Sequence, residues 1–347
     1  MWKVIVGGLL LGIGVLGAQE TATPESDLIR VDVNVVNVPV SVTDKDGRFL
    51  IDLTKDDFKV WENGKRVEIR YLTTGEDEEN TPPLRAGILL DMSNAARLYY
   101  KTYKESIGDL VDQLVPEGGR DQGFLMGYHT EVDLLVPMTN DPYLIVEKLE
   151  NVKHGGGAAM LDAIYEACTN QLAMQDYQGL GEPRKVIVII GDGHDTASKH
   201  SLDEVLYEAQ RSQVTIHALS TVAWGFHVQG SSNLVKLTEE TGGRIVQPME
   251  NPHKDVSGYL SKPQDAGNFV YTVGTGEYNA AQLQALFDAI KDIVGGIRKQ
   301  YVLGYAPPTP FSDGQFRSIR VEMGLTKYVD LKIRHRAGYY PPRIANP

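Results

Sequence analysis

Residues 87–100 of the sequence read GILLDMSNAARLYY, an apolar run that ends at Asp91 and is followed closely by Ser93. A continuous apolar run of this kind is typical of a strand that is covered on both faces of a parallel sheet. An Asp-x-Ser sequence at the end of such a strand places carboxylate and hydroxyl oxygens where ligands bind in open α/β sheets. The stretch therefore predicts a central strand with a candidate binding site at its carboxyl end.

Strands and helices alternate around this stretch. Apolar runs predict further strands, and amphipathic segments with a period near 3.6 residues predict helices between them. This alternation predicts an α/β fold with a doubly wound, mostly parallel, Rossmann-like sheet and helices on both faces. The expected strands include 85–91, 185–192 and 214–221, and the expected helices are 103–115, 158–174, 202–213, 233–243 and 279–300.

Three stretches follow strands of this expected sheet. They are DMSNA (91–95), GGGAAMLDAI (155–164) and IIGDGHD (189–195). Because the carboxyl ends of parallel strands meet at one edge of a sheet, we expect these stretches to lie together at that edge, which we call the top edge.

Both flanks of the α/β region have the pattern of β-strands. Valine alternates with smaller or polar residues over 31–42, and Asn63-Gly64 is a dipeptide typical of a tight hairpin. Each flank has roughly 45 residues, about the lower limit for an independent core. We therefore expect the flanks to pair as one smaller β-sandwich in which the α/β domain is inserted. The expected boundaries are 29–75 and 300–342 for the sandwich and 84–299 for the α/β domain, with an irregular insertion at 249–277.

Composition and charge restrict the partners and the location. The chain has 347 residues and a formal net charge of -12, so nucleic acid and anionic lipid are not expected as partners. Residues 1–18 contain Lys3, an apolar stretch and small residues at the end, which is typical of a signal peptide. The sequence thus predicts an exported protein, periplasmic or extracellular, without membrane insertion after cleavage. Cys168 is the single cysteine, so no intrachain disulfide forms.

The motifs together resemble a known family. The strand ending in Asp-x-Ser, the glycine-rich stretch before Leu-Asp-Ala-Ile and the later strand ending in Asp-Gly are similar to those of von Willebrand factor type A domains. The flanking segments DFKVWENGK, QYVLGY, DGQFRSIRV and GYYPP resemble the von Willebrand type A-related (VWFA) proteins of Acidobacteria. The resemblance covers residues 29–342 and implies the same inserted α/β architecture.

The resemblance implies a metal-ion-dependent adhesion site. In the family, two serines and a threonine supply hydroxyls, two aspartates act mainly through water, and one coordination position stays open for an acidic group of a partner. Carried onto this sequence, the site consists of Asp91, Ser93 and Asp192. The second serine falls on Ala95 and the threonine on Ala158, and a methyl group cannot coordinate a cation. The expected site is therefore degenerate, with no cofactor other than a weakly bound Mg²⁺ or Mn²⁺ ion, because Mg²⁺ requires near-octahedral oxygen ligands.

A degenerate site leaves two carboxylates close together. Like charges at Asp91 and Asp192 would raise one pKa or require a basic neighbour. Arg97, Lys101 and His194 are all candidates for that neighbour, and the sequence does not choose among them.

The leading functional hypothesis is an exported, non-enzymatic protein-binding or adhesion module that recognises a protein partner at the top edge. One alternative is a structural envelope component with a vestigial site, and another is a metal-assisted hydrolase that uses Asp91 and Asp192. The sequence has no Gly-x-Ser-x-Gly, no His-Glu-x-x-His and no Gly-x-Gly-x-x-Gly between a strand and a helix. The set of His194, Asp195 and His200 lacks a zinc-ligand spacing and is interpreted as loop polarity.

Overall fold

The computed structural model describes residues 35–75, 77, 80–173, 182–221, 231–248, 276–309, 311, 314–324 and 328–341. The expected signal peptide (1–18) and all but the last two residues of the expected insertion (249–277) lie outside these ranges. Among the described residues, no helix has the length and apolarity that crossing a membrane requires.

The centre of the fold is a six-stranded sheet with the order β10-β9-β8-β5-β6-β7. Its strands run parallel except β7, which pairs antiparallel with β6 at one edge. The doubly wound, mostly parallel sheet predicted from the sequence is therefore confirmed. The strands are β5 (Leu84–Asp91), β6 (Gln122–Tyr128), β7 (Val132–Thr139), β8 (Arg184–Gly191), β9 (Val214–Ser220) and β10 (Ile245–Val246).

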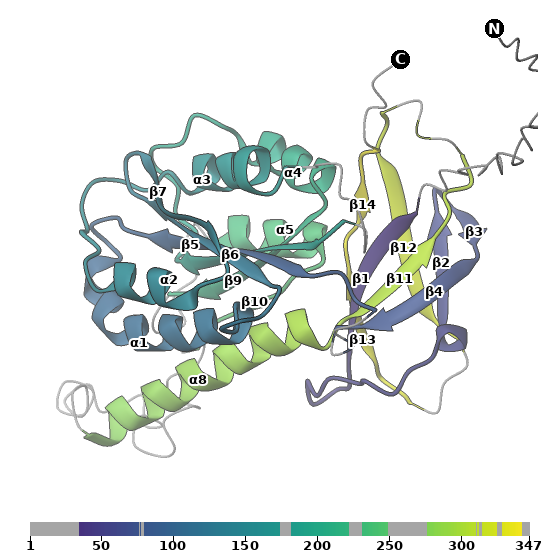
Figure 1. The fold of residues 1–347 in the computed structure, drawn as a ribbon, viewed down its shortest axis with the longest axis horizontal. Helices are drawn as coiled ribbons and strands as arrows, with labels where there is room; N and C mark the ends of the chain where they lie inside the picture. Colours follow the sequence, from purple (N-terminus) through teal and green to yellow (C-terminus); the bar gives the residue numbers. More distant parts are fainter. Residues whose placement is uncertain are drawn as a thin grey trace, which may run out of the picture. The chain divides into compact units, whose positions relative to one another are not determined.

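Helices cover both faces of this sheet (Figure 1). One apolar core lies between the sheet and helices α1, α2 and α8, and a second core lies between the opposite face and helices α3, α4 and α5. Because both faces are covered, β5 and β8 consist of almost continuous apolar residues. The helices are α1 (Arg97–Leu114), α2 (Pro142–Leu149), α3 (Met160–Glu166) with a π-helical turn (Ala167–Gln171), α4 (Leu202–Arg211), α5 (Ser231–Thr241) and α8 (Gly276–Arg298).

The winding direction of the sheet reverses between β5 and β8. From β5 the chain continues through α1 to β6 and β7 on one side, and then returns through α2 and α3 to β8 on the other side of β5. The carboxyl ends of β5 and β8 therefore form the topological switch point, the place where open α/β sheets bind ligands. Asp91 ends β5 and Asp192 follows β8 directly, so both lie at this point.

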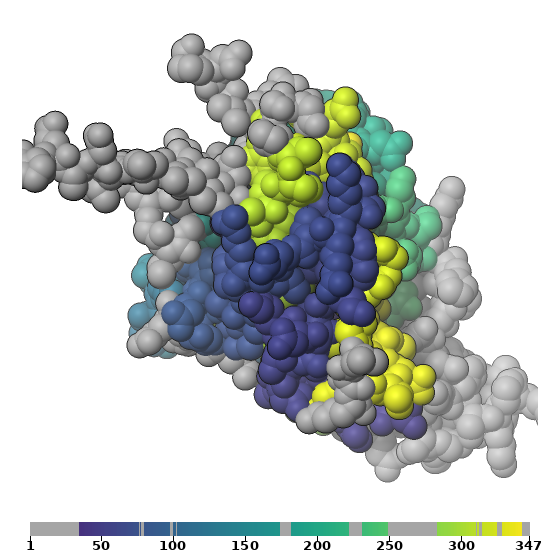
Figure 2. Space-filling view, turned by 90° about the vertical axis from the view of Figure 1, so that its right-hand side faces the viewer, coloured from purple at the N-terminus to yellow at the C-terminus, as the bar shows by residue number. Residues whose placement is uncertain are grey.

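A β-sandwich is built from the two flanks of the chain. One sheet has the order β13-β1-β11-β4 and the other β14-β12-β2-β3, so each combines strands from before and after the α/β region. Figure 2 shows these segments, purple-blue and yellow, side by side on one face. The predicted pairing of the flanks is confirmed. The elements are β1 (Val36–Thr43), a 3₁₀ turn (Lys55–Asp57), β2 (Phe58–Glu62), β3 (Lys65–Val67), β4 (Ile69–Thr74), β11 (Tyr301–Tyr305), β12 (Arg317–Met323), β13 (Lys332–His335) and β14 (Gly338–Tyr339).

A buried polar network joins the two flanks inside the sandwich. The Glu62 carboxylate accepts hydrogen bonds from the hydroxyls of Tyr305, at 2.6 Å, and Tyr339, at 2.9 Å. It also pairs with the Arg317 guanidinium at 3.3 Å, and both charged side chains are only 1% exposed. A buried charge is tolerated when it is paired and hydrogen-bonded, so this network links strands from both ends of the chain.

The entry and the exit of the α/β region lie side by side. The backbone N–H of Gly75, just after β4, donates to the carbonyl of Gln300, just before β11, at 2.8 Å. A Cβ added at Gly75 would overlap the carbonyl of Arg298, so the close approach requires glycine. The sandwich also contacts the α/β region directly, because the N–H of Ala337 donates to the carbonyl of Glu240 at 3.0 Å.

Candidate functional site

The three loops expected at the top edge do meet there. After β5, the N–H of Asn94 donates to the carbonyl of Gly156 at 3.3 Å, and the N–H of Gly155 donates to the carbonyl of Met92 at 2.9 Å. The loop after β8 joins the same assembly, because the N–H of Thr196 donates to the carbonyl of Ala158 at 2.8 Å. Backbone hydrogen bonds thus hold the three stretches in one cluster.

Asp91 is buried at the base of this cluster and is 3% exposed. Its Oδ1 accepts the N–H of Ser93 at 2.8 Å, and the Ser93 hydroxyl also hydrogen-bonds to the carboxylate. Burial raises the pKa of Asp91 to about 6 against the opposing effect of the Ser93 hydrogen bonds, and the negative charge of Asp192 raises it further. The structure therefore brings the predicted residues Asp91, Ser93 and Asp192 together.

His194 is the basic neighbour of the two carboxylates. The backbone N–H of His194 donates to Asp192 Oδ1 at 2.9 Å, and the ring Nδ1 of His194 lies 3.6 Å from Asp192 Oδ2. Its positive charge also lowers the pKa of Asp91. The other two candidates lie elsewhere. The positive charge of Arg97, together with burial, lowers the pKa of His154, and the Lys101 side chain is exposed.

Alanine occupies the two positions that the resemblance assigns to hydroxyl ligands, Ala95 and Ala158. Ala95 is exposed, and Ala158 is buried with its N–H donating to Thr196 Oγ1 at 2.9 Å. Among the described residues, no three or more His, Cys, Asp or Glu side chains form a group that could hold a metal ion. Asp91, Ser93 and Asp192 offer two carboxylates and one hydroxyl, so a Mg²⁺ ion held by them would keep water at its remaining positions and bind weakly.

Tyr128 is a site residue that the sequence analysis missed. It ends β6 beside Asp91, and its buried hydroxyl has no hydrogen-bond partner in the described part of the chain. Burial raises its pKa well above 10, and the negative charges of Asp91, Asp192 and Asp195 raise it further. A Cβ added at Gly191 would overlap this hydroxyl. The Tyr128 phenol therefore packs against Gly191, beneath the carboxylates of Asp91 and Asp192. The signal available in the sequence was its position at the end of a predicted strand, which places it at the same edge of the sheet as Asp91.

Two threonine hydroxyls accept hydrogen bonds from the backbone of the glycine-rich loop. Thr130 Oγ1 accepts the N–H of Gly157 at 3.1 Å, in addition to the contact of Thr196 with Ala158. Gly156 has a φ of 72°, and a Cβ there would overlap Thr130 Oγ1. Glycine at this position therefore meets both a backbone and a packing requirement.

The loop after Asp192 attaches to the start of α3. Asp195 Oδ2 accepts the N–H of Leu161 at 2.8 Å, and Asp162 lies 2.7 Å from Nδ1 of His200. The His200 ring stacks on Tyr165 with ring centroids 3.8 Å apart. Asp195 and His200 thus hydrogen-bond to separate groups, which agrees with the interpretation of these residues as loop polarity.

Comparisons with known proteins give only distant structural likenesses. No family model matches the sequence, and no curated protein matches it. The chain is similar to BatB, a conserved hypothetical protein from Bacteroides thetaiotaomicron, with 14% identity over 58% of this chain and 98% of that chain and a TM-score of 0.40. It is also similar to proximal thread matrix protein 1 from the mussel byssus, whose zinc-occupied MIDAS form shows 15% identity over 62% of this chain and 48% of that chain, with a TM-score of 0.42.

A third similar structure is the VWA domain of SpRpn10, with 13% identity over 49% of this chain and 90% of that chain and a TM-score of 0.37. At these identities and scores the likenesses assign no activity, ligand or partner to this chain. Its fold class follows from the strand order and connections described above.

Proposed function

We propose that the chain is an exported, non-enzymatic protein-binding module of the von Willebrand type A class, related to the VWFA proteins of Acidobacteria, with the top edge as its contact surface. The observation that carries the proposal is the meeting of three backbone-linked loops at the switch point of the sheet. Export is supported by the signal-like composition of residues 1–18.

We also propose that the top edge binds its protein partner without a resident metal ion. Ala95 and Ala158 supply no ligand atoms, and His194 lies where it offsets the charge of Asp192. The partner then meets an edge of backbone groups and polar side chains, with Asn94 exposed at its surface.

The small space beside Asp91 supports a non-catalytic role. The cavity that Asp91 and Thr221 line measures about 10 Å³. That space holds about one water molecule, whereas ligand pockets measure roughly 300–1,000 Å³. A hydrolase that bound its substrate at this cavity, which Asp192 does not line, would require more room.

Photo-crosslinking tests the contact surface. A photo-crosslinking amino acid at Asn94, on the top edge, is expected to capture a protein partner from the envelope fraction of the source organism, with EDTA present throughout. The matched control is Tyr143 on α2, which is 61% exposed and follows the end of β7 at the opposite edge of the sheet. Equal capture at both positions, or none at Asn94, would contradict the proposal and favour a structural envelope component with a vestigial top edge.

Thermal unfolding tests the absence of a functional ion. The wild-type Tm is expected to be the same in Mg²⁺, Mn²⁺ and EDTA. Restoring the two hydroxyls in the double variant Ala95→Ser and Ala158→Thr is expected to create a Mg²⁺-dependent stabilisation of about 1–3 kcal/mol at saturating ion. Adding Asp192→Asn should remove this stabilisation. A wild-type Tm that rises with Mg²⁺ and falls in EDTA would show that the native residues bind the ion after all.

A further inference from the structure

The β2–β3 hairpin of the sandwich opens at one end. Val60, Trp61 and Glu62 of β2 pair with β3, but the chain then passes through Glu68 into β4, which belongs to the other sheet. Phe58 and Lys59 pair with β12 on one side only, and no described strand pairs with them on the other side. Phe58 and Lys59 of β2 therefore have an unpaired edge next to Glu68, where the chain passes from one sheet to the other. We call this place the sandwich corner.

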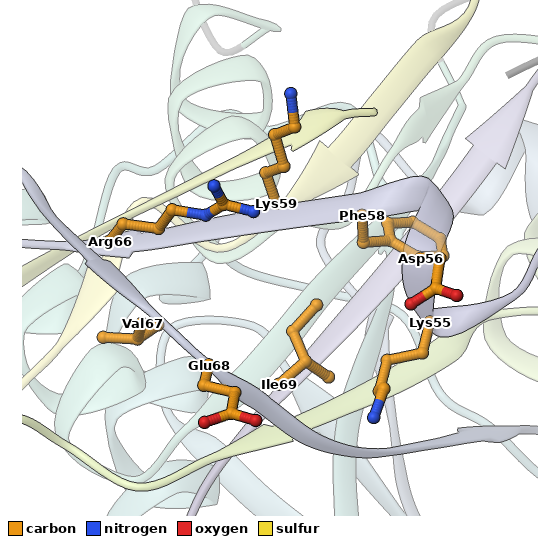
Figure 3. A pocket seen from close by; sticks show the side chains of 8 residues that line it. All are labelled: Lys55, Asp56, Phe58, Lys59, Arg66, Val67, Glu68 and Ile69. Carbon is orange, nitrogen blue, oxygen red and sulfur yellow. The ribbon is translucent and has the colours of Figure 1, made fainter. Parts of the chain in front are cut away.

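A cavity of about 500 Å³ lies at this opening. Its apolar lining consists of Phe58, Val67 and Ile69 (Figure 3). The Phe58 ring also packs on Tyr301, with ring centroids 5.3 Å apart. The volume falls in the range of ligand pockets, roughly 300–1,000 Å³. An unpaired strand edge beside an apolar pocket is the arrangement that accepts an extended peptide as an added strand.

Three cations and two carboxylates line the cavity, a net charge of +1. Lys55, Lys59 and Arg66 line it, and none of them forms an ion pair with another described residue, while the acidic lining residues are Asp56 and Glu68. In Figure 3 the Lys59 and Arg66 side chains lie on the same side of the hairpin. Opposed charges across a binding surface steer encounter and select partners, so these cations favour an acidic ligand.

The sandwich also differs in charge from the rest of the chain. The flanking segments 36–74 and 301–339 contain 13 Lys and Arg against 10 Asp and Glu, an excess of +3. Residues 84–299 contain 18 against 28, an excess of -10. The sandwich segments therefore carry a small positive excess, although Arg317 and Arg336 are buried, in a chain whose net charge is -12.

We propose that this corner binds an extended, acidic segment of a partner protein, added as a strand along the free edge of β2. Successive side chains of a strand point to opposite faces, as Phe58 (buried) and Lys59 (part-exposed) already do. An apolar residue of the segment then packs on Val67, the part-exposed apolar residue of the lining, and the next residue places a carboxylate beside Lys59 and Arg66. This binding surface is separate from the top edge and does not depend on the function proposed there.

Fluorescence polarisation with the full chain tests the proposal. The probe is a labelled short peptide in which glutamate and valine alternate, and the comparison peptides replace glutamate by lysine or the central valine by proline. Binding is expected for the first peptide, weaker binding at high salt, and no binding for the other two, because lysine is repelled and proline cannot donate to the strand edge.

Charge-reversal variants locate the binding surface. Lys59→Glu with Arg66→Glu is expected to weaken binding by at least about tenfold. Lys45→Glu with Arg48→Glu makes the same charge change at exposed positions of the same sandwich that do not line the cavity, and should leave binding unchanged.

Hydrogen exchange of the complex is expected to show new protection within residues 55–69. Absence of binding, equal loss in both double variants, equal binding of the proline peptide, or protection elsewhere would each overturn the proposal. Competition by a simple dicarboxylate as strong as by the peptide would also overturn it, because it would show a site for small anions.

Discussion

At the scale of single residues, the Tyr128 hydroxyl is the most unusual group of the top edge, because it is buried without a partner among the described residues. An unsatisfied buried hydroxyl costs about 1–3 kcal/mol. Tyr128→Phe is therefore expected to leave the free energy of unfolding in urea unchanged or to raise it by about 1 kcal/mol. Tyr305→Phe is the control, because its hydroxyl donates to Glu62 at 2.6 Å and its loss should destabilise by about 1–3 kcal/mol. Equal losses in the two variants would contradict this interpretation of Tyr128.

His217 of β9 makes stability depend on pH. Its ring nitrogens lack partners among the described residues, and burial, together with the positive charges of Arg244 and Arg334, lowers its pKa to about 3. The unfolded chain takes up a proton near pH 6.5 and the folded chain does not, so stability falls as the pH drops below 6.5. Between pH 7 and pH 5 the contribution of His217 to this loss is about 2 kcal/mol, and Asp91, whose pKa is raised to about 6, offsets about 1 kcal/mol of it because the folded chain takes up that proton.

Urea denaturation at both pH values measures this loss. In His217→Leu this contribution is expected to disappear, whereas His129→Gln, at a part-exposed histidine, should keep the wild-type difference. An unchanged pH difference in His217→Leu would show that other groups cause it.

The residues of the top edge differ in how far the sequence predicts them. Asp91 and Asp192 each end a buried strand, so the parallel sheet alone brings them to one edge. Tyr128 also ends a strand, but tyrosine is common in strands and therefore does not mark a site. Only the packing against Gly191 shows where its hydroxyl points. The choice of His194 over Arg97 likewise depends on the conformation of a loop, which carries no periodic pattern.

At the scale of elements, regular periodicity predicts the strands and helices well and their ends poorly. The hairpin at Asn63-Gly64 is confirmed, with φ values of 48° and 77°. The helix expected at 103–115 begins earlier, at Arg97, after an N-cap residue whose side chain makes no capping hydrogen bond, so no sequence signal marks its start. The helix expected at 158–174 is α-helical only to Glu166 and continues as a π-helical turn. Both forms present nearly the same apolar face, so the pattern does not distinguish them.

The start of α4 has a capping box that can be tested. Ser201 Oγ accepts the N–H of Glu204 at 3.3 Å, and Glu204 Oε2 accepts the N–H of Ser201 at 2.8 Å. Ser201→Ala is expected to lower the free energy of unfolding by about 1 kcal/mol. Asp203→Ala removes an exposed acidic residue from the same turn, paired with Lys236, and is expected to lower it by less than about 0.5 kcal/mol. Chemical denaturation of both variants separates the cap from the charge, and equal losses would contradict a role for the cap.

At the scale of the whole molecule, stability depends on the network that joins the two flanks. Glu62→Gln keeps the volume but leaves Arg317 buried without its charged partner, and it is expected to destabilise the protein by about 3–5 kcal/mol. Glu322→Gln breaks an exposed ion pair with Arg320 in the same sheet and is expected to change stability by less than about 1 kcal/mol. The free energy of unfolding in urea measures both. A small effect at Glu62 would show that the network is not what holds the flanks together.

The pairing of the flanks is predictable because neither is large enough to bury a core alone. The register is not, since it depends on cross-strand contacts such as that of Val60 with Val321, which are far apart in the sequence. The open end of the β2–β3 hairpin was missed for the same reason. The alternation of residues 57–72 indicates one regular hairpin and gives no sign that the strand changes sheets at Glu68.

The hydrogen bond between Gly75 and Gln300 joins the two points where the chain enters and leaves the α/β region. This bond determines which part of the molecule a stretching force reaches first. Under a force applied at residues 36 and 339, we expect the sandwich to be stretched first, because β4 and β11 are paired next to this bond at the base of the α/β region. We expect the α/β region to carry no tension until the pairing of β4 with β11 breaks. The top edge, which we propose as the contact surface, is then expected to keep its structure while the sandwich bears the force.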